Sequence, residues 1–334
     1  MEFSIGCNGR GVMHVEPVSV DEQFRMIRDS GVFDHFDRMP QHGQEQEYLR
    51  ASEKYGVPIR TGLWSYVAGR DEALLEQNLR LSKSLGGEFH NIMLYNNHAE
   101  GHVITDREIV DFYLHAYETS QKIGIDIGFE VHIYMWSEDF RRISRVARQV
   151  EARGVPFHFV LDHSHVLLKV DNAEEQDVSG IRQDVEAGRL IIDPYEPGNV
   201  LDEWIGMNMI QWLQVRPVSP NGPKNPWQLK EGGTYGRACQ YPFFRPAPGE
   251  WHLPWQAYRV EPCKEVVRRV LRHHRDTADS PLRYITTDMI DMPDYGGGVR
   301  YSLFEQNVAI AEWFRHAWHE IKAETSAVTQ EPRP

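Results

Sequence analysis

The sequence predicts an α/β protein folded as a (β/α)8 barrel. Eight short apolar segments alternate with longer amphipathic ones, the pattern of strands and helices around a parallel sheet. At 334 residues the chain has the length that such barrels commonly take as one domain. Residues 156–166, PFHFVLDHSHV, are typical of a strand covered on both faces, and the run ends in Asp162, His163 and His165. Ligands of parallel α/β folds bind at the carboxyl ends of strands, so these polar residues suggest a site.

Four strand and helix pairs account for the first half of the chain. We expect strands at residues 3–7, 32–36, 57–66 and 89–95, and helices at 19–29, 44–54, 70–85 and 106–123. Ser19 is a residue type that caps helix N-termini. Gly86 and Gly124 are suited to ending the third and fourth helices.

The second half continues the alternation less regularly. We expect strands at residues 125–134, 156–166, 209–218 and 284–290, with a short extra strand at 190–192, and helices at 137–153, 177–187, 263–274 and 301–325. Ser137 is the expected cap of the first of these helices. Residues 219–262 are dense in Pro, Gly and aromatics, and disordered linkers are poor in aromatics, so we interpret them as an ordered excursion over the barrel mouth. The barrel domain then spans residues 1–325, followed by a flexible tail at 326–334.

The composition of the chain bears on which partners and which cellular location we expect. With 36 basic and 49 acidic residues the net charge is −13, which disfavours nucleic acid. No segment approaches the roughly 18 apolar residues of a membrane span, and we expect no membrane partner. The start, MEFSIGCNGR, lacks the pattern of a secretory signal, so we expect a cytoplasmic protein. Cys7, Cys239 and Cys263 are far apart and suggest ordinary thiols, whereas 16 His hint at metal or acid/base chemistry.

Oxygen-bearing side chains follow the last four strands of the expected barrel. The candidates are Glu130, Asp162, Gln214 and Asp288, with Asp291 as a competitor of Asp288. Carboxylates crowded at one mouth repel each other, and a divalent cation is the usual remedy. Hard oxygen ligands favour magnesium or manganese. Each residue also has a structural alternative: a carboxylate paired with Arg, or an amide that is only a hydrogen-bond partner.

At these residues the sequence resembles the xylose-isomerase-like barrels, which include sugar isomerases, keto-sugar epimerases, inosose dehydratases and the endonuclease IV branch. The resemblance rests on GFEVH at residues 128–132, on Asp162-x-x-His165, and on the order of polar residues along strands five to eight. It implies a divalent metal, Mn²⁺ first and Mg²⁺ or Co²⁺ as alternatives, bound by Glu130, Asp162, Gln214 and Asp288. Two positions depart from the family pattern, since Gln214 replaces His and Asp288 replaces Glu.

The implied chemistry is removal of the proton next to a sugar carbonyl, through a metal-stabilised enediolate. The resemblance implies that Glu130 and Asp288 act as a pair, in which one is the base that removes the proton and the other is the acid that returns a proton. His132 stands two residues after Glu130 on the expected strand, so both side chains point to the same side, and a neutral imidazole suits a proton shuttle. The expected substrate contacts are His165, Arg216, Trp64 and His98, with one of Trp251 or Trp255.

Three functions remain open at this point. The first is a metal-dependent isomerase or epimerase of a carbohydrate or keto-sugar, with a lyase as its alternative, such as the barrel subunit of a C-glycoside deglycosidase acting on 3-keto glycosides. The second is a nuclease of the endonuclease IV type, which the charge and Gln214 weigh against. The third is a metal-free binding subunit, which Gln214 and Asp288 favour. We expect a homo-oligomer, or a complex with a small second subunit for the deglycosidase.

Overall fold

Eight parallel strands close into a barrel in sequence order, with β1 paired to β8. The structure is a computed structural model that describes residues 2–229, 232–237 and 239–328. The predicted (β/α)8 barrel is thereby confirmed. The strands are β1 (Ser4–Asn8), β2 (His35–Asp37), β3 (Ile59–Tyr66), β4 (Phe89–Leu94), β5 (Asp126–Glu130), β6 (Phe159–Asp162), β7 (Ile210–Val215) and β8 (Tyr284–Thr287).

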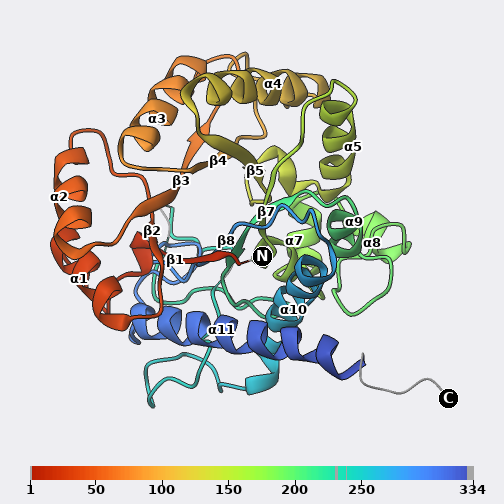
Figure 1. Ribbon diagram of the computed structural model, residues 1–334. Helices are drawn as coiled ribbons and strands as arrows, with labels where there is room; N and C mark the ends of the chain where they lie inside the picture. The colour runs from red at the N-terminus through yellow and green to blue at the C-terminus, as the bar shows by residue number, and fades with distance from the viewer. Residues whose placement is uncertain (1, 230–231, 238, 329–334) are drawn as a thin grey trace.

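Helices form the outer ring of the barrel, seen down its axis in Figure 1. They are α1 (Val20–Ser30), α2 (Glu45–Tyr55), α3 (Glu72–Ser84), α4 (Asp106–Ile123), α5 (Phe140–Glu151), α6 (Ser164–Leu167), α7 (Ala173–Val178), α8 (Arg182–Glu186), α9 (Val200–Gly206), α10 (Glu261–Asp276) and α11 (Leu303–Val328). Within the described ranges, none of them is both long and apolar enough to cross a membrane.

Local signals in the sequence set several helix ends. The Ser19 hydroxyl accepts a hydrogen bond from the Glu22 backbone N–H at 3.2 Å, as expected of a cap, and begins α1. Gly124 ends α4 in the left-handed conformation, with φ of 80°. The cap of α5 is Asp139 and not Ser137, because the Ser137 hydroxyl is used elsewhere, at the end of β5.

The barrel interior is filled by side chains from four strands. Phe89, Val160, Trp212 and Tyr284 form a buried cluster of their own, and the Trp212 indole N–H donates to the Thr286 hydroxyl at 2.9 Å. Such layers make a (β/α)8 barrel a packed core and not a pore. Open space for a ligand therefore remains only at a mouth.

Several predicted elements are shorter than expected or absent. β5 ends at Glu130 and β6 at Asp162, where the chain turns into the short helix α6. Residues 190–192 are not a strand. The helix predicted at 177–187 is divided between α7 and α8 by Gly180, which adopts a φ of 65°. The sequence analysis did not predict α6 or α9, and α9 covers the segment before β7.

The described part of the excursion at residues 219–262 is packed against the barrel, and a 3-10 turn, Ala257–Val260, lies near its end. Tyr241 and Trp251 join the main core. The Gln240 side chain exchanges two hydrogen bonds of 3.0 Å with the backbone of Ile290. The excursion thus supports the loop at residues 288–302 between β8 and α11. At the other end, residues 326–328 continue α11, and the rest of the predicted tail lies outside the described residues.

Candidate active site

A cavity of about 390 Å³ opens at the carboxyl ends of the strands. Its walls come from the ends of β1 to β5, β7 and β8 and from the 288–302 loop. No described residue of the excursion lines it. The polar and aromatic residues of the wall are Asn8, Arg10, Asp37, Arg38, Gln41, Trp64, Ser65, Tyr95, Glu130, His132, Tyr134, Gln214, Arg216, Asp288, Asp294 and Tyr295.

Glu130 is buried at the last position of β5 and faces this cavity. The Asn91 amide on the neighbouring strand β4 donates a hydrogen bond of 2.5 Å to its carboxylate. Burial raises the pKa of Glu130 well above its ordinary value, and the negative charges of Asp162 and Asp288 add to this. The carboxyl group therefore needs either a proton or a nearby cation.

His132 reaches the cavity from a turn and not from the predicted strand. The Ser137 hydroxyl donates to the Glu130 carbonyl at 2.5 Å and accepts from the His132 backbone N–H at 3.2 Å, which holds that turn. The His132 Nδ1 lies 2.5 Å from the Ile133 carbonyl, so this nitrogen donates. Its Nε2 accepts from the Tyr295 hydroxyl at 3.1 Å. Burial, followed by the neighbouring His165, lowers the pKa of His132 well below its usual value, so the imidazole is neutral.

The Arg216 guanidinium contacts two of the four predicted metal ligands, Asp162 and Asp288. It is buried, its Nη2 pairs with the Asp162 carboxylate, and its Nη1 lies 3.2 Å from an oxygen of Asp288. Its Nε donates to the Ser164 hydroxyl at 3.1 Å. The Tyr295 ring covers its face at 3.8 Å. One side chain thus joins the ends of β6, β7 and β8.

Asp162 ends β6 because its carboxylate accepts a hydrogen bond of 3.0 Å from the Ser164 backbone N–H, which turns the chain. Burial alone would raise the pKa of Asp162, but the charges of Arg216 and His165 bring the pKa below its ordinary value. Asp162 is therefore an ionised partner of Arg216. His165 lies on α6 in that turn, with its Nε2 3.2 Å from the Asp162 carboxylate and its Nδ1 buried without a partner.

Asp288 follows β8 and is held by two neighbours. The Asn8 amide donates to its carboxylate at 2.7 Å, opposite the oxygen that faces Arg216. Burial raises the pKa of Asp288 to about 7 although Arg216 opposes the shift. The competing Asp291 lies in a separate small cavity with Gly9 and Arg10.

Gln214 is buried on β7 and faces the cavity with its side-chain amide unsatisfied. Neither its oxygen nor its nitrogen has a hydrogen-bond partner. Buried amides are nearly always paired in proteins, so this one is available to a ligand. Gln214 pairs in register with Asp162 on β6 and with Thr286 on β8, so it lies at the same level of the barrel as these residues.

Of the other predicted substrate contacts, some line the cavity and some lie away from it. Trp64 lines the cavity, as Arg216 does, whereas His165 lies behind His132 with ring centres 4.1 Å apart. His98 is outside, in the loop before α4, where its ring stacks on His102 at 4.7 Å. Neither Trp251 nor Trp255 borders the cavity.

Asp37 and Tyr295 are site residues that the sequence argument missed. Asp37 is buried at the end of β2, where Thr61 donates to one carboxylate oxygen at 2.8 Å and the other oxygen has no partner. Burial raises its pKa to about 7. The rule applied to the other strands, a carboxylate directly after an apolar run, also identifies Asp37. No comparable signal marks Tyr295, which lies in the 288–302 loop.

Among the described residues, two groups of side chains bring three metal-binding atoms within 4.8 Å of one another. One is Glu130, His132 and His165 in the cavity, and the other is His98, His102 and Glu108 near the surface. Asp162 and Asp288 belong to neither group.

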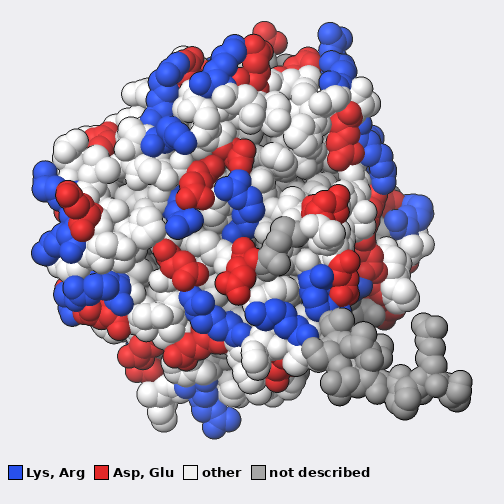
Figure 2. Space-filling view, in the orientation of Figure 1, with Lys and Arg blue, Asp and Glu red and all other residues white. Residues whose placement is uncertain are grey.

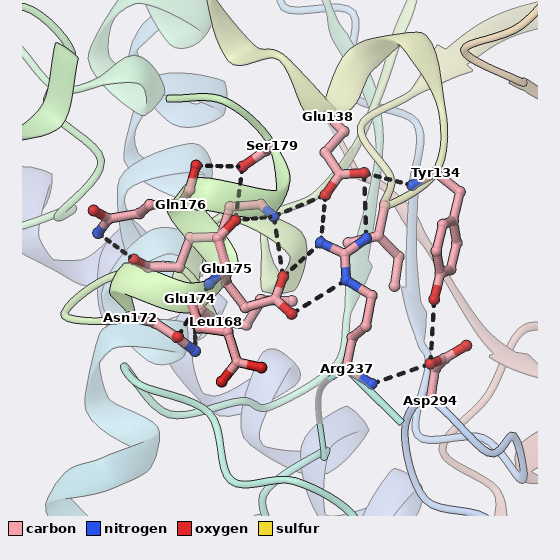
Figure 3. A network of polar contacts seen from close by, with 12 residues as sticks. Tyr134, Glu138, Leu168, Asn172, Glu174, Glu175, Gln176, Ser179, Arg237 and Asp294 are labelled. Atoms are coloured by element: carbon pink, nitrogen blue, oxygen red, sulfur yellow. Dashed lines mark hydrogen bonds and ion pairs between the residues drawn. The ribbon is translucent and has the colours of Figure 1, made fainter. Parts of the chain in front are cut away.

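An ionic cluster fastens the excursion next to the cavity. Figure 3 shows Arg237 between Glu138 and Glu175, and its Nη2 lies 2.6 Å from a carboxylate oxygen of each. The Arg237 backbone N–H also donates to Asp294, a residue of the cavity wall, at 3.1 Å. The excursion is therefore tied to the mouth through the loops around it.

Charge is mixed over the outside of the barrel. On the face in Figure 2, Lys and Arg side chains are interspersed with Asp and Glu side chains. That face lacks the continuous basic strip that a phosphate backbone would follow.

No protein-family model and no curated protein matches the chain. Solved structures do match. An L-ribulose 3-epimerase is similar with a TM-score of 0.57 at 9% identity, over 100% of both chains. The 3-keto-D-glucoside 4-epimerase YcjR of E. coli has a TM-score of 0.52 at 14% identity, over 94% of this chain and 100% of the other. The IOLI protein, solved with zinc, has a TM-score of 0.52 at 12% identity, over 96% of this chain and 99% of the other. Identities this low show a likeness of fold alone, and the chain has the fold of the xylose isomerase-like TIM barrels.

Proposed function

We propose that the protein is a carbohydrate isomerase or epimerase that removes the proton next to a sugar carbonyl and returns a proton to the resulting enediolate. The observation that carries this proposal is a set of proton-transfer groups in one cavity: Glu130, His132 and Asp288 line it together with the buried Arg216. Two solved structures with this fold are an L-ribulose 3-epimerase and a 3-keto-D-glucoside 4-epimerase, which supports an epimerase.

In this proposal the two carboxyl groups share the proton transfer. Glu130 and Asp288 approach the cavity from β5 and β8, so one takes the proton from carbon while the other returns one. Reprotonation of the same carbon gives an epimer, and reprotonation of its neighbour gives an isomer. The Arg216 charge stabilises the negative oxygen of the enediolate. The Trp64 ring offers an apolar face to the C–H side of a sugar.

The expected manganese does not fit the predicted ligand set as the side chains stand. A metal on Asp162 and Asp288 would need the carboxylate oxygens that Arg216 already contacts. Glu130, His132 and His165 form an alternative donor set, but the Arg216 Nη2 is 2.9 Å from the His165 Nε2. A divalent ion there would stand beside a permanent positive charge. No step of the proposed reaction therefore uses a metal.

A lyase of the same fold class is the second candidate, and His132 is the observation that favours it. An elimination starts with the same proton removal and then needs an acid for the leaving group. His132 is a third proton-transfer group in the cavity beside the two carboxyl groups, and it can protonate a leaving group. A C-glycoside deglycosidase acting on 3-keto glycosides, with a small second subunit, is the specific form of this alternative.

The test is exchange of solvent deuterium into a panel of keto-sugars and 3-keto glycosides, followed by NMR. We expect deuterium on a carbon next to the carbonyl of at least one compound, and loss of this exchange in Glu130→Gln. Release of an aglycone during the exchange would identify the lyase instead. A folded wild-type protein that exchanges no proton in any member of the panel would refute both.

A further inference from the structure

Three buried carboxyl groups at the carboxyl ends of the strands lie near one buried guanidinium, that of Arg216. Glu130, Asp162 and Asp288 are three buried carboxyl groups from β5, β6 and the end of β8. Arg216 is the buried cation that contacts two of them. Buried carboxylates without a cation are strongly unfavourable. The guanidinium thus fills the electrostatic role that a divalent ion fills in an oxygen-ligand site.

Arg216 directly follows β7, and its position continues the alternation of side chains along that strand. Side chains alternate along a strand, and Trp212, Gln214 and Arg216 all point into the barrel, the first into the interior cluster and the others into the cavity. Ser164 and Tyr295 then hold the guanidinium from its Nε and from its face. The cation is therefore built into the fold.

We propose that Arg216 replaces a divalent metal ion in this barrel, and that the side chains around it form a latent metal site. Asp162 and Asp288 contact the guanidinium, and Glu130 and Gln214 line the same cavity as Arg216. All four side chains offer oxygen atoms, the donor type of magnesium and manganese. The buried amide of Gln214 has no partner, so its oxygen is free to act as a ligand. The role of Arg216 towards an oxyanion rests on the proposed function, whereas its occupation of the metal position does not.

Binding of Mn²⁺ alone tests the replacement. Because His98, His102 and Glu108 form a separate donor group near the surface, all proteins carry His102→Ala. The full-length chain, purified without chelator, should contain no stoichiometric metal and should not bind Mn²⁺ in calorimetry, and EDTA should not change its melting temperature. A parent protein that holds one equivalent of metal in the cavity overturns the proposal.

Substitution of Arg216 tests the latent site. Arg216→Ala should gain binding of one Mn²⁺, with a higher melting temperature in its presence, and adding Asp162→Asn should abolish the gain. Arg216→Lys keeps the charge and should gain nothing. Arg107→Ala, at an exposed arginine paired with Asp111, is the matched control and should also gain nothing. A folded Arg216→Ala protein that does not bind Mn²⁺ refutes the latent site.

Two outcomes separate this proposal from the proposed function. If Arg216→Ala does not fold without metal, it is refolded once in buffer with Mn²⁺ and once in buffer with EDTA. Refolding only with Mn²⁺ supports the replacement. Failure to refold in either buffer contradicts it. If no sugar is turned over, the Mn²⁺ results still stand, because they measure binding and not catalysis.

Discussion

Single residues at this site are placed by hydrogen bonds that interrupt regular structure. The Ser137 hydroxyl holds the turn after Glu130, and the Asp162 carboxylate turns the chain after β6. These bonds move His132 and His165 out of the strands in which the sequence places them. Their side chains nevertheless meet, with ring centres 4.1 Å apart. The turn after β5 therefore directs the His132 imidazole into the cavity.

Removal of the His132 imidazole should slow turnover without loss of the fold. His132 is neutral, faces the cavity and receives a hydrogen bond from Tyr295, so His132→Ala should lower kcat by ~10²-fold or more, as for a lost general base. Steady-state kinetics on the substrate found by deuterium exchange give the number. His98→Ala, outside the cavity, is the control and should keep its rate. Unchanged turnover in His132→Ala would leave that residue a structural role.

At the scale of elements, the excursion after β7 acts through its neighbours. Arg237 pairs with Glu138 after β5 and with Glu175 in α7, and Lys169 also contacts both carboxylates, at 2.9 Å and 3.3 Å. Asn225 donates to the Gly297 carbonyl at 2.8 Å. The Gln240 backbone N–H also donates to the Tyr295 carbonyl at 3.3 Å, so the excursion helps to hold the residue whose ring covers Arg216.

The Arg237 cluster should make stability depend on pH in the acid range. Burial would raise the pKa of Glu138, but Arg237 and Lys169 lower it from 4.5 to about 2. The ionised carboxylate therefore stabilises the fold above the ordinary pKa, and this contribution is lost as the pH falls towards 2. Urea midpoints should be higher for the wild type than for Glu138→Gln at neutral pH, and the difference should shrink at about pH 3. Glu100→Gln, at an exposed carboxylate, should show no such trend.

At the scale of the whole molecule, a closed barrel separates a packed interior from an open mouth. Phe89, Val160, Trp212 and Tyr284 fill the interior from four strands, and the cavity lies beyond them. Assembly into a homo-oligomer, or with a small second subunit, stays a prediction that light scattering on the purified protein addresses.

Truncation of Trp212 should destabilise the entire barrel. The side chain is fully buried among three other strands, so Trp212→Ala leaves a large internal void and should cost about 3–5 kcal/mol of unfolding free energy. Urea denaturation measures the loss. Tyr258→Ala removes an aromatic ring that is 63% exposed and should change the stability little. Equal effects of the two substitutions would contradict a packed interior.

The sequence by itself determined the architecture and the strands that carry the site. Alternating apolar and amphipathic segments predicted all eight strands. The polar residues at strand ends pointed to Glu130, Gln214, Arg216 and Asp288, which line the cavity, and to Asp162, which pairs with Arg216. Periodicity suffices for this because it reports which face of an element is buried.

Only the tertiary structure decided what those residues do to one another. Arg216 pairs with Asp162, 54 positions away in the sequence, and with Asp288 beyond the next strand, under a tyrosine from the 288–302 loop. A pattern along one strand contains no information on such partners, because closure of the barrel brings together the ends of different strands. The sequence argument therefore expected a metal ion beside these carboxylates, whereas the folded chain places the Arg216 guanidinium against two of them.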